Sequence, residues 1–196
     1  MTAVETHIVK AVHAEQAPRA APPPAALVDD ALAESFRLLA LNIQRLLEGD
    51  SRRSVLVMSA HPEDGRTLVV VRLAQALAEV SEPILVLDVD PLGSADFRSA
   101  HSLRVVAPAR LGPTTQASLI SKARDVLSAA EGEGLTVIID TPPCTRSSVA
   151  FHLARRVGGV LYVARRRRED LAVHADVRSQ LDLLGARVLG IVFNEE

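Results

Sequence analysis

Short apolar runs rich in Val, Ile and Leu recur along this chain and alternate with longer amphipathic segments. The runs occupy residues 55–58, 84–87, 103–107, 135–139, 159–163 and 187–193. Between them, apolar residues return every three or four positions, as on one face of a helix. This spacing predicts helices over about residues 67–79, 115–130, 147–156 and 169–184. Because near-continuous apolar strands are typical of sheets buried on both faces, we expect an α/β domain with a mostly parallel sheet and helices on both faces.

One more helix is expected before the first apolar run. Between Leu32 and Leu47, apolar residues again recur at three- and four-residue spacing, which places them on one helix face. Gly49 follows directly and can end the helix. Glu34 and Arg37 are three positions apart, so their side chains can form an ion pair on the helix surface.

The first residues have a different composition. Residues 1–28 contain an Ala- and Pro-rich stretch without sustained periodicity, and proline both removes backbone donors and disfavours helix. We therefore expect residues 1–28 to be a disordered leader, either a plain tail or a tether for a partner, and residues 29–196 to form one folded domain.

Composition and charge exclude several classes of function. The formal net charge of −2 gives no overall attraction to nucleic acid, so no nucleic acid is expected as a partner. A single cysteine, Cys144, excludes an internal disulfide and fits a reducing compartment. No apolar run approaches the roughly 18 residues that span a bilayer. These features predict a cytoplasmic protein.

The stretch 54–67 is the clearest candidate for a functional site. An apolar strand from Val55 to Met58 leads into a compact polar loop, and an amphipathic helix follows from Thr67. In a strand–loop–helix unit of this kind, backbone N–H groups and a helix N-terminus can bind a phosphate. The loop ends in Gly65-Arg66-Thr67, where a phosphate-binding loop ends in Gly-Lys-Ser or Gly-Lys-Thr. The sequence thus predicts a nucleotide site with a changed central residue.

Polar residues also follow three other predicted strands. Asp88 and Asp140 each end a buried run, and Asn194 ends the last one. Ligands of parallel α/β sheets bind beyond the carboxyl ends of the strands. We therefore expect these side chains to meet the loop at one edge of the sheet.

Several segments, in order along the chain, resemble the cytoplasmic ATPase domain of the bacterial tyrosine kinases that regulate capsule and exopolysaccharide synthesis. The closest likeness is the run Val-Ile-Ile-Asp-Thr-Pro-Pro that ends at Pro143, against the family's Ile-Ile-Asp-Thr-Pro-Pro. The segments that carry the resemblance are residues 34–44, 59–67, 85–90, 137–143 and 184–194. The resemblance implies a P-loop ATPase fold, related to that of the partition and septum-positioning ATPases, with ATP and Mg²⁺ as cofactors.

The resemblance also assigns roles to individual residues. Asp88 is the best candidate to activate an attacking hydroxyl, with Asp90 as a secondary candidate, and Asp140 completes the catalytic set. The metal ligands would be Thr67, Asp88 and Asp140. The candidate nucleotide-binding residues are Pro62, Glu63, Asp64, Gly65, Arg66, Thr67 and Leu68, together with Asn194, which would contact the adenine.

The chain departs from the family at important positions. Arg66 stands where the family has a lysine that bridges phosphates, and the chain's lysines, Lys10 and Lys122, lie far from the loop. Arginine keeps the charge, but its planar fork is bulkier than a point charge. Glu63 replaces a family glycine and adds negative charge beside a polyanion. No tyrosine-rich tail follows Asn194 in the sequence, so autophosphorylation of such a tail is not expected.

Three hypotheses therefore stay open, and whether the chain is an enzyme stays open with them. The first is a kinase-like P-loop ATPase domain in capsule or exopolysaccharide synthesis or export, with weakened nucleotide binding or catalysis. The second is a non-catalytic module that binds a membrane polysaccharide co-polymerase (a chain-length regulator) or an export subunit through the helix at residues 32–47, which would recruit it to the inner face of the membrane. The third is a partition- or positioning-type ATPase. Formation of a homo-oligomer is also open, since Ala40 replaces the second arginine of the family's self-association helix.

Overall fold

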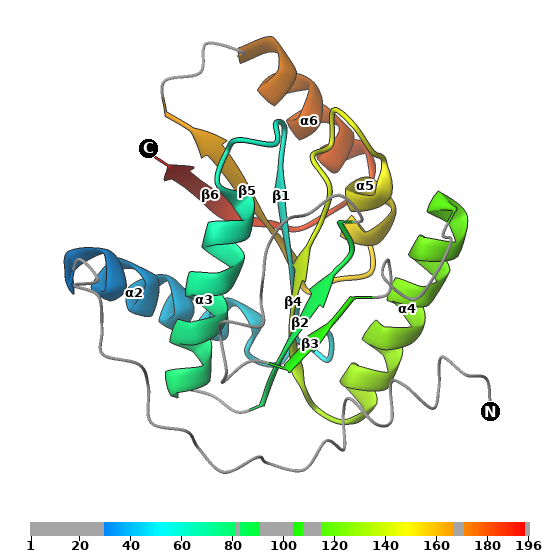
Figure 1. Ribbon diagram of the computed structural model, residues 1–196. Coiled ribbons are helices and arrows are strands. Elements are labelled where there is room, and N and C mark those ends of the chain that lie inside the picture. Colours follow the sequence, from blue (N-terminus) through cyan, green and yellow to red (C-terminus); the bar gives the residue numbers. More distant parts are fainter. Residues whose placement is uncertain (1–29, 81–82, 91–103, 108–114, 167–170, 195–196) are drawn as a thin grey trace.

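A six-stranded parallel sheet forms the centre of the described structure, a computed structural model that describes residues 30–80, 83–90, 104–107, 115–166 and 171–194 (Figure 1). Its strands are β1 (Ser54–Ser59), β2 (Ile84–Asp88), β3 (Arg104–Val106), β4 (Thr136–Asp140), β5 (Gly159–Arg165) and β6 (Val188–Asn194). They lie in the order β3-β2-β4-β1-β5-β6, and each neighbouring pair is parallel. The predicted fold class and all the predicted strands are confirmed, with boundaries that differ by a residue or two.

Helices cover both faces of this sheet, as the sequence predicts (Figure 1). The helices are α2 (Asp30–Leu47), α3 (Arg66–Val80), α4 (Gln116–Gly132), α5 (Val149–Ala154) and α6 (Leu171–Leu183). Apolar side chains of α2 and α3 pack with one face of the sheet, and those of α4, α5 and α6 pack with the other. The expected pair on α2 is present, with Arg37 Nη1 3.3 Å from Glu34 Oε2, and Arg37 also reaches Glu79 of α3 at 3.0 Å.

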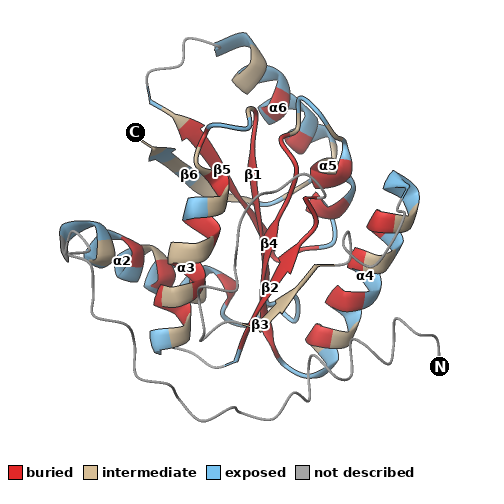
Figure 2. Ribbon diagram, viewed as in Figure 1, coloured by how far each residue is buried: buried red, intermediate tan, exposed pale blue. Residues whose placement is uncertain are grey.

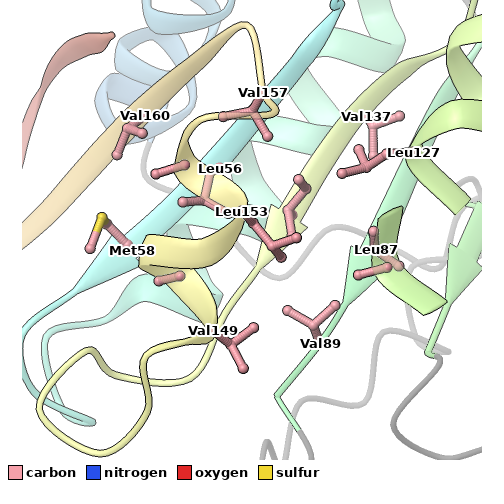
Figure 3. Packing of buried hydrophobic residues seen from close by; sticks show 14 of the residues in the cluster. Leu56, Met58, Leu87, Val89, Leu127, Val137, Val149, Leu153, Val157 and Val160 are labelled. Atoms are coloured by element: carbon pink, nitrogen blue, oxygen red, sulfur yellow. The ribbon is translucent and has the colours of Figure 1, made fainter. Parts of the chain in front are cut away.

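The core of the domain consists of two layers of aliphatic side chains, one on each side of the sheet. Figure 2 shows the inner strands as buried. On the α4–α5 face, one buried cluster contains Leu153 and Val149 of α5, Leu56 and Met58 of β1, and Leu87 of β2 (Figure 3). All five are nearly or fully excluded from solvent. Burial of this size explains how the sheet forms with few aromatic residues, since each large aliphatic side chain contributes about 1.5–3 kcal/mol.

The two outer strands differ from the inner ones. Every residue of β1, β2 and β4 is buried, whereas β3 and β6 are only partly covered. On β6, Ile191 and Phe193 expose more than half of their surface. The expectation of burial on both faces therefore holds for the inner strands, and it fails at the edges because an edge strand has a neighbour on one side only.

Two sequence predictions concern the first residues of the chain. The predicted leader, residues 1–28, and the start of the predicted domain at residue 29 lie outside the described residues.

Within the described residues, every helix is too short or too polar to cross a lipid bilayer.

Candidate functional site

The carboxyl ends of the inner strands bring the predicted polar residues together. Asp88 of β2 and Asp140 of β4 are register partners on adjacent strands. β1 lies on the other side of β4 and leads into the loop that starts after Ser59. Asn194, at the end of β6, donates a hydrogen bond from Nδ2 to the Asp64 carbonyl oxygen of that loop at 3.3 Å. One edge of the sheet thus carries the loop and the predicted polar side chains, as the sequence predicts.

Local hydrogen bonds give the loop its shape. The backbone N–H of His61 donates to Asp64 Oδ2 at 2.8 Å, and the Ser59 hydroxyl donates to the His61 carbonyl at 2.9 Å. Asp64 is fully buried, so its carboxylate belongs to the interior of the loop. These bonds close a tight turn between β1 and α3.

Gly65 is required where the loop enters α3. Its φ angle is +84°, in the left-handed region that side chains other than glycine rarely adopt. A Cβ at this position would also collide with the side-chain amide of Asn194. The glycine therefore allows the loop and the end of β6 to approach each other closely.

The turn after β4 holds the loop from the other side. The backbone N–H of Cys144 donates to the Ser59 carbonyl at 2.9 Å, and the Thr145 hydroxyl donates to the Ala60 carbonyl at 2.6 Å. Burial raises the pKa of the Cys144 thiol to about 11, so at neutral pH it is a protonated, weakly reactive group. Cys144 is thus part of the packing around the loop.

Arg66 occupies the centre of the site, and its side chain points into the protein. Its Nε donates to Asp140 Oδ1 at 2.7 Å, and its Nη2 donates to Asp90 Oδ2 at 3.0 Å. A third nitrogen, Nη1, donates to the Ser59 hydroxyl at 3.1 Å. Only 4% of the residue is exposed. The guanidinium therefore bridges two buried carboxylates, and we name this arrangement, Arg66 with Asp90, Asp140 and Ser59, the arginine clamp.

Two further interactions complete the cluster of carboxylates. The Thr67 hydroxyl donates to Asp140 Oδ2 at 2.8 Å, and the Asp90 backbone N–H donates to Asp88 Oδ1 at 3.1 Å. Burial raises the pKa of Asp140, while the charge of Arg66 and the hydrogen bonds from Arg66 and Thr67 act in the opposite direction. Arg66 and Thr67 thus favour the ionised form of Asp140, against the larger effect of burial on its pKa.

The predicted metal ligands lie together, but a Mg²⁺ ion does not fit the side chains as they are arranged. Both carboxylate oxygens of Asp140 already accept hydrogen bonds from Arg66 and Thr67, and Asp90 Oδ2 accepts one from Arg66. A divalent ion about 4 Å from the guanidinium would be repelled by roughly 8 kcal/mol at an effective dielectric constant near 20. Among the described residues, no group of three or more His, Cys, Asp and Glu side chains is placed to hold a metal ion.

The backbone of the loop retains what a phosphate needs. The first N–H groups of α3, those of Arg66, Thr67 and Leu68, have no acceptor within the helix, and a helix start attracts anions. The side chains counteract this attraction. Glu63 is largely exposed on the loop, with one oxygen 4.0 Å from Arg165 Nη1, and the guanidinium of Arg66 is turned away from the surface. The site thus combines a suitable backbone with unfavourable charges.

The chain's only tyrosine lies inside the fold. Tyr162 of β5 is 6% exposed, and its hydroxyl is 2.7 Å from Nδ1 of His174 on α6. The two rings are in a T-shaped arrangement with centroids 5.7 Å apart. Sequence reasoning places Tyr162 in a strand but does not identify this contact, because no pattern in the sequence links β5 to α6.

The sequence therefore identifies the members of the site better than their contacts. Arg66, Thr67 and Asp140 are in direct contact, Asp90 joins them through Arg66, and Asp88 joins them through the Asp90 backbone. The roles assigned to Pro62, Glu63, Asp64, Gly65, Leu68 and Asn194 toward a nucleotide stay predictions. Sequence reasoning places Arg66 against phosphate, whereas the structure places its guanidinium against carboxylates. It also misses Ser59 as a partner of Arg66, although that serine starts the segment 59–67 that carries the family resemblance.

Comparisons with known proteins support the fold. No family model and no curated protein sequence matches this chain. Among solved structures, the kinase domain of the Escherichia coli tyrosine kinase ETK is similar over 92% of this chain and 83% of that one, with a TM-score of 0.75 and 21% identity. The VpsO kinase domain is similar over 88% of this chain and 100% of that one, with a TM-score of 0.68 and 21% identity.

A third solved structure extends the comparison to a nucleotide-binding protein. This protein, from Archaeoglobus fulgidus and in complex with ADP, is similar over 79% of this chain and 71% of that one, with a TM-score of 0.57 and 20% identity. These TM-scores, at identities of 20–21%, establish a shared fold. The chain described here thus shares the fold of the ETK and VpsO kinase domains, an α/β fold of the P-loop NTPase type.

Proposed function

We propose that this chain is a tyrosine-kinase-like P-loop ATPase-domain protein of capsule or exopolysaccharide synthesis or export, with weakened nucleotide binding and catalysis. The similarity of its fold to tyrosine kinase domains supports the first part of the proposal. The resemblance of its loop and strand-end motifs to the same family supports it further. ATP is the proposed nucleotide.

The arginine clamp is the main observation that supports weakened nucleotide binding and catalysis. In a P-loop, the lysine at this position contacts the β- and γ-phosphates of the nucleotide. Here the corresponding cation forms ion pairs with two carboxylates, at 2.7 Å to Asp140 and 3.0 Å to Asp90, inside the protein. Because the guanidinium is buried in these two ion pairs, turning it toward a phosphate at the surface would break both of them. This cost opposes nucleotide binding.

The phosphorylation step of a tyrosine kinase also lacks an accessible acceptor in the described part of the chain. Tyr162 is buried and in contact with His174, so its hydroxyl is not available to another molecule. Asp88, the proposed activating base, is itself 2% exposed. Phosphorylation of a tyrosine within this domain is therefore not part of the proposed function.

A specific surface favours the second candidate function, a module that binds a membrane polysaccharide co-polymerase or an export subunit. Leu38 and Leu41 on the outer face of α2 are 54% and 50% exposed. They are three positions apart, so they form one apolar strip on the helix. We propose this strip as the contact with the co-polymerase, which would place the domain at the inner face of the membrane. Binding that survives Leu38→Asp/Leu41→Asp would contradict this assignment.

Calorimetric titration of the purified protein with ATP and Mg²⁺ tests the proposed function. We expect a Kd above about 1 mM, equivalent to a binding free energy weaker than about −4 kcal/mol, and no phosphotyrosine after incubation. Micromolar binding that is lost in Asp88→Asn/Asp140→Asn would contradict the weakened site. Steady ATP turnover that depends on Asp88, without phosphotyrosine, would instead favour the partition- or positioning-type ATPase.

A further inference from the structure

In the arginine clamp, one cationic group contacts oxygen atoms of several residues, as a metal ion does in a metal site. The three nitrogens of one planar group contact oxygen atoms of three residues that come from different strands or follow them: Ser59 of β1, Asp90 after β2, and Asp140 of β4. Bridging several oxygens of this kind, carboxylates above all, is what a hard divalent cation does in other sites. In this chain, a side chain already occupies that bridging position.

We propose that Arg66 takes the place of a divalent metal ion in this site, so that its guanidinium balances Asp90 and Asp140 and the site operates without Mg²⁺. The proposal rests on the proposed function, because it concerns the same nucleotide site. It adds that the carboxylates serve the protein by holding Arg66 and have no role as metal ligands.

The planar guanidinium of arginine makes it possible for a side chain to replace a metal ion here. A guanidinium presents donors in several directions within one plane, so Nε and Nη2 can contact two carboxylates at the same time. A lysine ammonium in this position would be a compact charge that pairs well with one carboxylate. The change from lysine to arginine therefore allows the side chain to pair with two carboxylates in place of one, although its charge is the same.

Arg66 and a metal ion exclude each other in this arrangement. A metal ion that bridged Asp90 and Asp140 in the same way would need Asp140 Oδ1 and Asp90 Oδ2, which accept hydrogen bonds from Arg66. The remaining Asp140 oxygen accepts from Thr67, the residue that would otherwise be a direct metal ligand. The described residues contain no trio of side chains placed to hold a metal. Among the described residues, the guanidinium of Arg66 is thus the cation that contacts both carboxylates.

Mn²⁺ alone, without nucleotide, is the probe that tests this proposal. Its binding to the full-length protein at pH 8 can be measured by water-proton relaxation and by the shift in melting temperature. The wild-type protein is expected to bind Mn²⁺ no more than twofold tighter than Asp90→Asn/Asp140→Asn. Tenfold tighter binding by the wild type would overturn the proposal, because the carboxylates would then hold a metal despite Arg66.

The second part of the Mn²⁺ experiment uses a variant without the guanidinium of Arg66. Arg66→Gln is expected to bind Mn²⁺ at least tenfold tighter than the wild type. If Arg66→Gln does not fold, Arg66→Lys is measured in its place. Equal affinity of the folded variant and the wild type would overturn the claim that Arg66 takes the place of the ion. Arg178→Gln removes an arginine from an exposed pair with Asp182 and is expected to leave Mn²⁺ binding unchanged. Since no nucleotide is present, failure here is distinct from failure of the ATP titration.

Discussion

Replacing Arg66 with methionine is expected to lower the free energy of unfolding by about 3–5 kcal/mol, as when one member of a buried ion pair is removed. The guanidinium is the shared partner of Asp90 and Asp140, both of which are nearly inaccessible to solvent. Methionine has a similar length but carries no charge, so both buried carboxylates would lose their ion pair with Arg66. Urea unfolding with linear extrapolation measures the change.

A matched control separates this effect from the loss of any arginine. Arg178 contacts both oxygens of Asp182 at 2.9 Å on the surface of α6, where both side chains are more than half exposed. Arg178→Met is expected to cost about 0–1 kcal/mol, since exposed ion pairs contribute little. If Arg66→Met cost no more than Arg178→Met, the clamp would not contribute to stability as the distances indicate.

The second large effect is expected on nucleotide affinity. The double variant Glu63→Gly/Arg66→Lys is expected to bind ATP at least tenfold tighter than the wild type, a gain of about 1.4 kcal/mol or more. Lysine is a flexible point charge that cannot hold both carboxylates at once, so it is free to contact phosphate. Glycine at position 63 removes a negative charge and a side chain from the loop. Calorimetric titration with ATP and Mg²⁺ measures the gain.

The single variants show which change matters more. Arg66→Lys alone is expected to give most of the gain, because it releases the clamp, while Glu63→Gly alone leaves Arg66 turned inward. Arg178→Lys changes an arginine to lysine outside the site and is expected to leave ATP affinity unaltered. A double variant with the same ATP affinity as the wild type would count strongly against a degenerate nucleotide site.

The fold could be predicted from the sequence because the local signals agree with the tertiary structure. Strands such as Ile84–Asp88 are continuous apolar runs, and such runs are stable only in the middle of a covered sheet. Parallel strands then place their carboxyl ends at one edge, which brings Asp88 next to Asp140 without any further information. The exposure of Ile191 and Phe193 could not be predicted in this way, since the pattern does not reveal which strand lies at an edge.

The contacts of the site could be predicted only in part. The sequence identifies Arg66 as unusual, but the direction of its long side chain depends on partners 24 and 74 positions away. A rotamer choice of this kind follows from the balance of buried charges, which exists only after the sheet has brought β2 and β4 together. The contact between Tyr162 and His174 is likewise a product of how α6 packs on the sheet.

A double-mutant cycle between Arg66 and Asp140 tests the arginine clamp most directly. The unfolding free energies of the wild type, Arg66→Met, Asp140→Asn and the double variant give the coupling between the two side chains. With Nε 2.7 Å from Oδ1 in the interior, we predict a favourable coupling of about 1.5–3 kcal/mol, within the range seen for residues in one network. Effects that add to within about 0.5 kcal/mol would mean that the two residues act independently, and the clamp would then not be the state of the protein in solution.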